Sequence, residues 1–252
     1  MKKIKVFTYI DRFTGPFLDV WVNYYSKIKN SSLSVLCRNE VDPVYVNKYE
    51  NVEFIYVGGY FTNHSRNEYT APLNLFIDYQ NTFLSKSDVV IYSDLDEIII
   101  HPNIDDVVQS NFDGCLVTTG VEIVHHVSVE SRLNFNEPIN RQRSNIIYTE
   151  WYDKPLIVNR PIGWGCPGKH NYEVHPKTID ELYLVHLGKI CFDHIKDFTN
   201  ENIDMYGQRR WYGFPIPLRE DSYVNTFNDP HSQKYPMVKI PDNLKLLIDK
   251  II

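Results

Sequence analysis

The N-terminal part of the chain alternates between short apolar runs and segments with helical spacing of apolar side chains. The apolar runs predict buried strands at residues 3–10, 33–37, 52–57 and 88–93. The helical segments, one of which has a proline in its first turn, lie at residues 17–28, 43–49 and 70–84. Strands that alternate with helices in this order form a parallel sheet with helices on both faces. We therefore predict an α/β fold, an α/β/α sandwich whose central sheet is mostly parallel.

The regular alternation ends after residue 93. The later sequence predicts a helix at residues 103–110, strands at 115–119, 121–127, 156–159 and 182–187, and a terminal helix at 243–252. The polar run 128–144 is typical of a loop or insertion. No repeat and no linker rich in Pro, Gly or Ser divides the sequence. We expect one domain over residues 1–252, with two functional halves at 1–100 and 101–252.

Charge and composition argue against several classes of protein. The sequence has 32 acidic and 26 basic residues, and its net charge of -6 argues against a nucleic-acid-binding protein. No apolar stretch approaches the roughly 20 residues that cross a bilayer, although peripheral membrane association stays open. Residues 1–10 lack the features of a signal peptide, and the four cysteines are too widely spaced for a zinc site or a disulfide framework. We therefore expect a cytoplasmic protein, whose oligomeric state the sequence does not predict.

The predicted strand at residues 88–93 runs directly into two aspartates, Asp94 and Asp96. Side chains two residues apart on an extended segment point the same way, so we expect these carboxylates to converge while Leu95 faces the interior. The pair would lie beyond the carboxyl end of a strand, where open α/β sheets bind ligands. Hard carboxylate oxygens select Mg²⁺ or Mn²⁺, whose remaining positions are open to substrate phosphates. The pattern therefore predicts a divalent metal site.

Two other interpretations fit an aspartate pair of this spacing. One is a solvated loop, because acidic residues are common at strand ends and in turns. The other is a phosphatase of the haloacid type, in which an Asp-x-Asp follows the first strand and leads into a threonine. Here the pair follows about the fourth predicted strand and leads into Glu97, which favours the metal site.

Residues 93–99, with the sequence Ser-Asp-Leu-Asp-Glu-Ile-Ile, resemble the Asp-x-Asp-Glu segment of glycosyltransferases with the GT-A fold, especially the family-2-like branch. Two later stretches resemble the same branch and occur in the same order. The first is a Lys-Pro strand leading to Gly-Lys-His at residues 154–170, and the second is an apolar strand ending in His-Leu at residues 182–187. The resemblance covers about residues 3–193.

This resemblance implies a Rossmann-like GT-A domain that transfers a sugar from a nucleotide-sugar donor to a glycan or lipid-linked acceptor. It implies Mn²⁺ or Mg²⁺ as cofactor, which would stabilise the charge that grows on the diphosphate as the sugar–phosphate bond breaks. Residues 1–100 would bind the nucleotide, and the later half would shape the acceptor side. The donor-binding positions that the resemblance implies are Thr8, Tyr9, Asp11, Arg12, Asn74, Ser93, Asp94, Lys169 and His170.

His186 ends an apolar strand, as the aspartate pair does, so its imidazole is a candidate third metal ligand beside Asp94 and Asp96. A hydrogen-bonded core histidine is the alternative. A catalytic base is needed if transfer inverts the sugar, because a carboxylate must then take the proton of the acceptor hydroxyl. The candidates are Glu122, Glu150, Asp153 and Glu173, with none preferred. Whether the reaction inverts or retains configuration therefore stays open.

Two other functions are compatible with these residues. A nucleotidyltransferase also binds nucleotide and metal, but it usually carries a glycine-rich basic loop after its first strand, and residues 11–15 lack one. A non-catalytic carbohydrate-binding module of the lectin kind is the other. Protection by nucleoside diphosphates in the presence of manganese distinguishes these classes.

Overall fold

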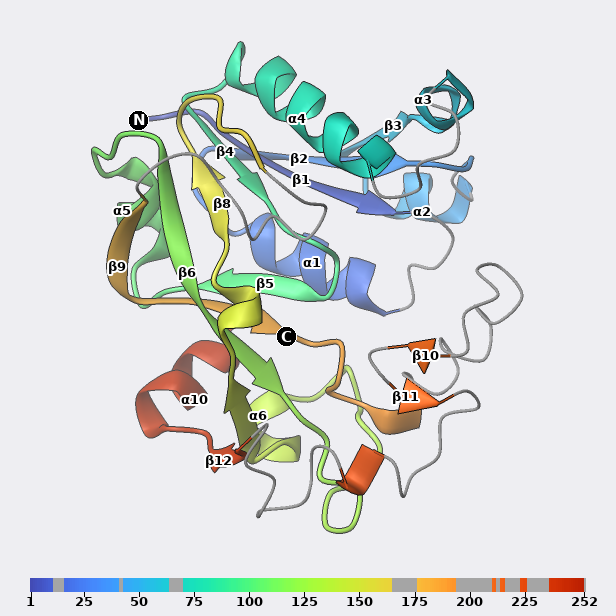
Figure 1. The fold of residues 1–252 in the computed structure, drawn as a ribbon, viewed down its shortest axis with the longest axis vertical. Helices are drawn as coiled ribbons and strands as arrows, with labels where there is room; N and C mark the ends of the chain where they lie inside the picture. Colours follow the sequence, from blue (N-terminus) through green and yellow to red (C-terminus); the bar gives the residue numbers. More distant parts are fainter. Residues whose placement is uncertain are drawn as a thin grey trace. The chain divides into compact units, whose positions relative to one another are not determined.

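The computed structural model divides the chain into two compact units (Figure 1). The first unit comprises Met1–Thr119 and Glu150–Leu184, and the second comprises Gly120–Thr149 and Val185–Ile252. The residues described are 1–10, 16–40, 43–63, 70–164, 176–193, 210–211, 214–215, 223–225 and 236–251. Each unit combines two separate stretches of the sequence, and the functional halves at residues 1–100 and 101–252 stay a prediction.

The first unit is built on a parallel sheet, as the sequence predicts. Its parallel strands, in the spatial order β4-β1-β2-β3, are β1 (Ile4–Ile10), β2 (Ser31–Cys37), β3 (Val52–Tyr56) and β4 (Val89–Tyr92). Phe7 of β1 pairs with Ser34 of β2 on one side and with Tyr92 of β4 on the other. The carboxyl ends of β1 and β4 therefore lie next to each other at one edge of the sheet.

Further strands of the first unit join this sheet on the far side of β4 or lie off the main strand order. They are β5 (Glu97–Ile100), the first half of β6 (Cys115–Ile123), β8 (Pro155–Val158) and β9 (Lys177–His186). β8 pairs antiparallel with both β4 and β6, and β5 pairs with β9. The sequence predicts β8 and the second half of β9. It misses β5, which begins only a few residues after β4 ends.

Two longer helices cover opposite faces of the parallel strands (Figure 1). α1 (Phe17–Tyr25) buries Trp21 and Tyr25 completely. α4 (Thr70–Leu84) has the predicted bounds, and its Phe83 ring lies 5.3 Å from the Phe7 ring of β1, centroid to centroid. The shorter helices of this unit are α2 (Pro43–Lys48), α3 (Gly58–Asn63), α5 (Ile104–Gln109) and the 3-10 helix η1 (Glu150–Tyr152). The predicted α/β class is therefore confirmed.

The second unit has a small antiparallel sheet and its own apolar core. The second half of β6 pairs with β7 (Asn145–Tyr148), which pairs with β12 (Val238–Lys239). A core cluster is formed by Val124, Ile147, Phe192 and Tyr223. The remaining described elements are α6 (Ile139–Gln142), α10 (Asp242–Ile248) and the paired strands β10 (Arg210–Trp211) and β11 (Phe214–Pro215).

Predictions were less accurate beyond residue 110. The strands predicted at 115–119 and 121–127 are one continuous strand, β6. The polar run 128–144 is not all loop, because it contains α6. The predicted terminal helix corresponds to α10, which begins and ends earlier than predicted.

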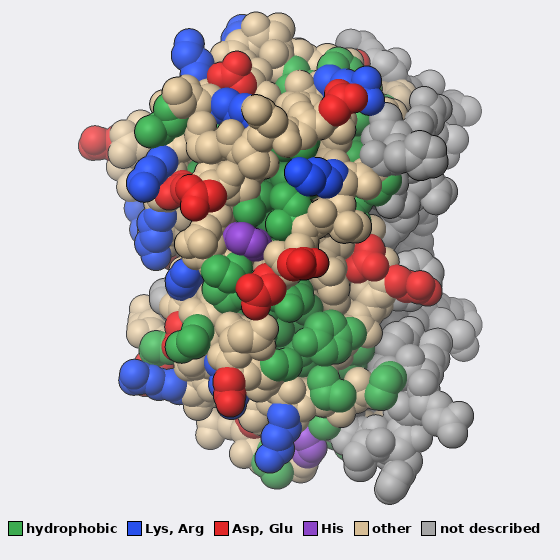
Figure 2. All heavy atoms as spheres, turned by 90° about the vertical axis from the view of Figure 1, so that its left-hand side faces the viewer, with side chains coloured by type: hydrophobic (Ala, Val, Ile, Leu, Met, Phe, Trp, Pro, Cys, Tyr) green, Lys and Arg blue, Asp and Glu red, His purple; other side chains and the backbone are tan. Residues whose placement is uncertain are grey.

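The surface shows mixed charge. On the face drawn in Figure 2, acidic and basic side chains both occur across the described residues, and no broad patch of one sign covers them. Within the described ranges, no helix combines the length and the apolar character needed to traverse a bilayer.

Candidate active site

The two predicted metal ligands lie in the tight connection between β4 and β5. β4 ends at Tyr92 and β5 begins at Glu97, whose backbone N–H donates to the carbonyl of Asp94 at 3.0 Å. Leu95 and Asp96 therefore form a turn, and the prediction of an extended segment with Leu95 facing the interior is wrong. Leu95 is half-buried, as are both aspartates. We call residues 94–97 the acidic turn.

A buried tyrosine fixes the first aspartate of the acidic turn. The Tyr92 hydroxyl donates to Oδ1 of Asp94. The Tyr92 ring is fully buried and packs between Phe7 and Phe76, with centroid distances of 4.9 and 4.7 Å. Burial, together with the charge of Asp94, raises the pKa of Tyr92 well above its ordinary value. The hydroxyl therefore stays protonated and remains a hydrogen-bond donor to Asp94.

Ser93 ties the acidic turn to α1. Its hydroxyl accepts a hydrogen bond from the Tyr25 hydroxyl at 2.9 Å and donates to the backbone carbonyl of Glu97. The side chain is fully buried. Ser93 thus holds the turn in shape, while its predicted contact with the donor stays a prediction.

A buried ion pair lies beside the two aspartates. Lys154 directly precedes β8. Its ammonium pairs with Oε1 of Glu97, and the side chains of Lys154 and Glu97 are only 5% and 2% exposed. Burial alone would lower the pKa of Lys154, but Glu97, Asp94 and Asp96 together raise it above its ordinary value. The sequence alone does not predict this role of Lys154. A lysine at the head of an apolar strand was the available signal.

The donor atoms of the acidic turn fit a divalent ion that shares its coordination with substrate. Within the described part of the chain, no group of three or more His, Cys, Asp and Glu side chains is arranged to enclose a metal. Mg²⁺ and Mn²⁺ commonly take one or two carboxylates and complete their shell with water and substrate phosphates. Asp94 and Asp96, half-buried at the carboxyl end of β4, match that kind of site.

The predicted donor-binding residues that the structure describes occupy three places. Thr8 is fully buried near the end of β1, and its hydroxyl has no hydrogen-bond partner among the described residues. Tyr9 is half-buried with its ring 5.8 Å from that of Phe76, and Asn74 is exposed on α4. The remaining predicted positions lie outside the described residues, and they are Asp11, Arg12, Lys169, His170 and the candidate base Glu173.

The carboxyl end of β1 adjoins the acidic turn. The backbone N–H of Ser93 donates to the carbonyl of Phe7 at 3.2 Å, which continues the pairing of β1 with β4 into the turn. The fold therefore brings Thr8 and Asp94, which are distant in sequence, to the same edge of the sheet.

Two further predicted residues meet in the second unit. Nδ1 of His186 lies 2.6 Å from Oε1 of Glu122, and the Lys189 ammonium contacts Oε2 of the same carboxylate. Burial raises the pKa of Glu122, but His186 and Lys189 outweigh burial and lower the pKa to about 2. Glu122 is thus a fixed anion, which is unsuited to a base that must take up a proton. The role of His186 as a third metal ligand stays a prediction.

The other two candidate bases belong to the first unit. Glu150 is exposed at the start of η1, and Asp153 is half-buried just after it. The backbone N–H of Asp153 donates to the carbonyl of Glu150 at 3.1 Å. Asp153 directly precedes Lys154, the partner of Glu97. This position favours Asp153 over the exposed Glu150.

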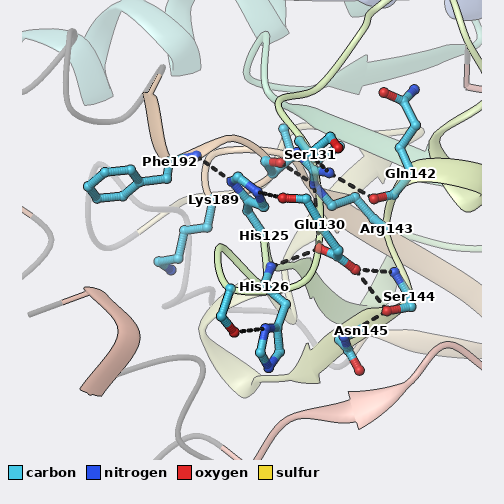
Figure 3. Close-up of polar contacts among 12 residues, drawn as sticks. His125, His126, Glu130, Ser131, Gln142, Arg143, Ser144, Asn145, Lys189 and Phe192 are labelled. Atoms are coloured by element: carbon cyan, nitrogen blue, oxygen red, sulfur yellow. Dashed lines mark hydrogen bonds and ion pairs between the residues drawn. The ribbon is translucent and has the colours of Figure 1, made fainter. Parts of the chain in front are cut away.

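His125 and His126 have structural contacts (Figure 3). The His125 ring is buried, with Nε2 3.0 Å from the carbonyl of Glu130 and Nδ1 accepting from the backbone N–H of Phe192. Nδ1 of His126 lies 3.0 Å from the Ser128 hydroxyl. The two rings therefore engage different partners.

No protein-family model and no curated protein matches this sequence. Solved structures to which the chain is similar include a mannosyltransferase from Pyrobaculum calidifontis in complex with GDP-Man and Mn²⁺ (TM-score 0.33, 11% identity, 50% of this chain and 36% of that one). They also include S. aureus TarS (0.35, 11%, 80% and 40%) and the glycosyltransferase GlyE of Streptococcus pneumoniae (0.33, 8%, 89% and 42%). The chain thus spans less than half of each of these proteins. Because these TM-scores and identities are low, the function is inferred from the residues of the chain itself.

Proposed function

We propose that this protein is a metal-dependent glycosyltransferase that moves a sugar from a nucleotide-sugar donor to a glycan or lipid-linked acceptor. The observation that carries the proposal is the acidic turn, whose two half-buried aspartates follow the end of β4. Buried side chains fix this turn: Tyr92 at the end of β4, Tyr25 of α1 acting through Ser93, and Lys154, which directly precedes β8. A solvated loop is the alternative to a metal site. Such a loop would not require a buried tyrosine, a buried serine and a buried ion pair to hold it.

Asp94 and Asp96 would bind Mn²⁺ or Mg²⁺ together with the donor diphosphate. When bound, the ion supplies positive charge that stabilises the departing nucleoside diphosphate. Tyr92 orients Asp94 through its hydroxyl, so this ligand is in place before the ion arrives. Asp153 is the proposed base for the acceptor hydroxyl, because it is half-buried and belongs to the first unit, which also holds the acidic turn.

The nucleoside would lie at the carboxyl end of β1. The Thr8 hydroxyl is completely buried and lacks a partner among the described residues. An unsatisfied buried hydroxyl costs about 1–3 kcal/mol, which a hydrogen bond to the donor would offset.

Three cysteines, Cys37, Cys115 and Cys191, are free thiols, which is compatible with the cytoplasmic setting that we expect.

Ligand-dependent thermal stability tests this proposal. UDP or GDP should raise the melting temperature of the wild-type protein in the presence of Mn²⁺, and much less in EDTA. D94N and D96N should each lose the Mn²⁺-dependent part of the increase. A nucleotidyltransferase would instead be protected by nucleoside triphosphates and release pyrophosphate from them. Protection by neither ligand class, or protection that survives both substitutions, would contradict the assignment.

A further inference from the structure

Lys154 is held rigidly at the back of the acidic turn. Its backbone carbonyl accepts hydrogen bonds from the N–H and the hydroxyl of Thr118, both at 3.2 Å. The Lys154 ammonium lies 5.2 Å from the centroid of the Tyr152 ring and pairs with Glu97. Because the backbone is anchored and the side chain is 5% exposed, the ammonium cannot leave for solvent.

The acidic turn carries more negative charge than this one lysine neutralises. Three carboxylates, on Asp94, Asp96 and Glu97, lie within four consecutive residues. All three interact favourably with the Lys154 ammonium, which is hydrogen-bonded to Glu97. Each of the three carboxylates could therefore pair with the ammonium. The hydrogen bond to Glu97 means that Glu97 is the carboxylate whose charge it neutralises.

We infer that Glu97 is a positioning residue that keeps the Lys154 ammonium bound to itself, so that Asp94 and Asp96 stay available to a divalent cation. The inference rests on the proposed function and adds to it the residue pair that sets the affinity for the ion. The backbone of Glu97 also closes the acidic turn through its N–H bond to Asp94, so one residue fixes both the shape and the charge of the site.

Replacing Glu97 by glutamine removes the preferred anion and leaves the cation in place. The ammonium would then be drawn to Asp94 and Asp96, where it competes with the metal. Opposite unit charges a few ångströms apart attract strongly at the effective dielectric constant of a protein surface, so Mn²⁺ binding should weaken by at least about tenfold in E97Q. The double variant E97Q/K154M lacks both charges, and its affinity should return to within about threefold of wild type.

Mn²⁺ binding is measured by the electron paramagnetic resonance signal of free Mn²⁺ in titrations of each protein with the metal alone. The proteins are wild type, E97Q, E97Q/K154M and the control D94N/D96N. A merely structural pair would lower the melting temperature in both Glu97 variants without restoring Mn²⁺ affinity in the double variant. Equal affinity of E97Q and wild type, or a double variant no tighter than E97Q, overturns the inference.

Two further results keep the test decisive. If E97Q does not fold, E97D replaces it, because the shorter carboxylate draws the ammonium toward the turn and should weaken Mn²⁺ binding by about threefold or more; unchanged affinity in E97D overturns the inference. If D94N/D96N binds Mn²⁺ as the wild type does, the proposed function itself fails. If D94N/D96N loses binding while E97Q keeps it, only the inference fails.

Discussion

His186 donates a hydrogen bond through Nδ1 to Oε1 of Glu122 at 2.6 Å, and both side chains are buried. An ionised carboxylate only accepts hydrogen bonds, so the Nδ1 atom carries the proton. Glu122, which the sequence offered as a base, thus orients His186 instead.

Glu122→Gln should make folding stability less dependent on acid pH. The pKa of Glu122 falls from an ordinary value of 4.5 to about 2 in the folded protein. Its carboxylate therefore contributes stability above pH 4.5 that is lost as the pH falls toward 2, and this contribution is roughly 3 kcal/mol. Denaturant titrations at pH 7 and pH 3 should show a larger loss in wild type than in E122Q. Parallel pH profiles would contradict the assigned ionisation.

Acid should loosen the backbone at Phe192. Burial lowers the pKa of His125 below its ordinary value of 6.5, so the neutral ring stabilises the fold above that pH and this stability is lost as the pH falls through the lowered pKa. Glu130, Arg143 and Asp193 are the charged groups that act on the ring. Protonation removes the acceptor for the Phe192 N–H, shown in Figure 3.

Amide hydrogen exchange at Phe192 measures this effect. After correction for the intrinsic rate, protection in wild type should fall as the pH is lowered from 7.5 to well below 6.5, the ordinary pKa of histidine. H126N is the matched control, because His126 is only half-buried and contacts Ser128. The protection of the Phe192 amide in H126N should therefore follow that in wild type. Unchanged protection of Phe192 across this pH range would show that His125 is not the titrating group.

Tyr92→Phe should lower sugar transfer while leaving the fold intact. The ring contacts with Phe7 and Phe76 are retained, but Asp94 loses the hydroxyl that fixes Oδ1. Loss of a hydrogen bond to a charged group corresponds to about tenfold in kcat/KM for a Mn²⁺-dependent donor. Tyr24→Phe is the control, since that buried hydroxyl donates to the Ile99 carbonyl at 2.9 Å. Equal activity of the two variants would argue against an orienting role for Tyr92.

Thr8→Val should separate donor binding from stability. Valine has the shape of threonine without its hydroxyl, and the Thr8 hydroxyl has no partner among the residues described. The free energy of unfolding should therefore stay the same or rise by up to about 1 kcal/mol. The KM for the nucleotide-sugar should rise if this hydroxyl contacts the donor. A destabilised variant with an unchanged KM would place the role of Thr8 in the fold instead.

Local patterns in the sequence predicted the parallel strands and the two longer helices of the first unit. α4 has the predicted bounds because proline in the first turn and helical spacing both act within a few residues. The acidic turn was found for the same reason, but its conformation was not, because the Glu97 N–H bond to Asp94 and the contact with Lys154 decide it. The ion pair joins residues 57 apart in sequence, and no local pattern encodes such a distance.

The second unit depends on contacts of this long-range kind. Arg143 lies in a polar run that predicts a loop, yet its side chain is fully buried. Its Nε atom donates to the Ile190 carbonyl at 2.6 Å, across 47 residues. Hydropathy places such an arginine at the surface, because burial is favourable only once distant carbonyls have folded around it.

Mn²⁺-dependent turnover tests the central claim most directly. UDP- and GDP-sugars are supplied with a panel of glycan and lipid-linked acceptors, and release of nucleoside diphosphate and formation of glycosylated product are measured together. We predict transfer by the wild type that EDTA abolishes, and loss of transfer to background in D94N and D96N at an unchanged melting temperature. Full metal-dependent transfer by either folded variant would contradict the role assigned to Asp94 and Asp96.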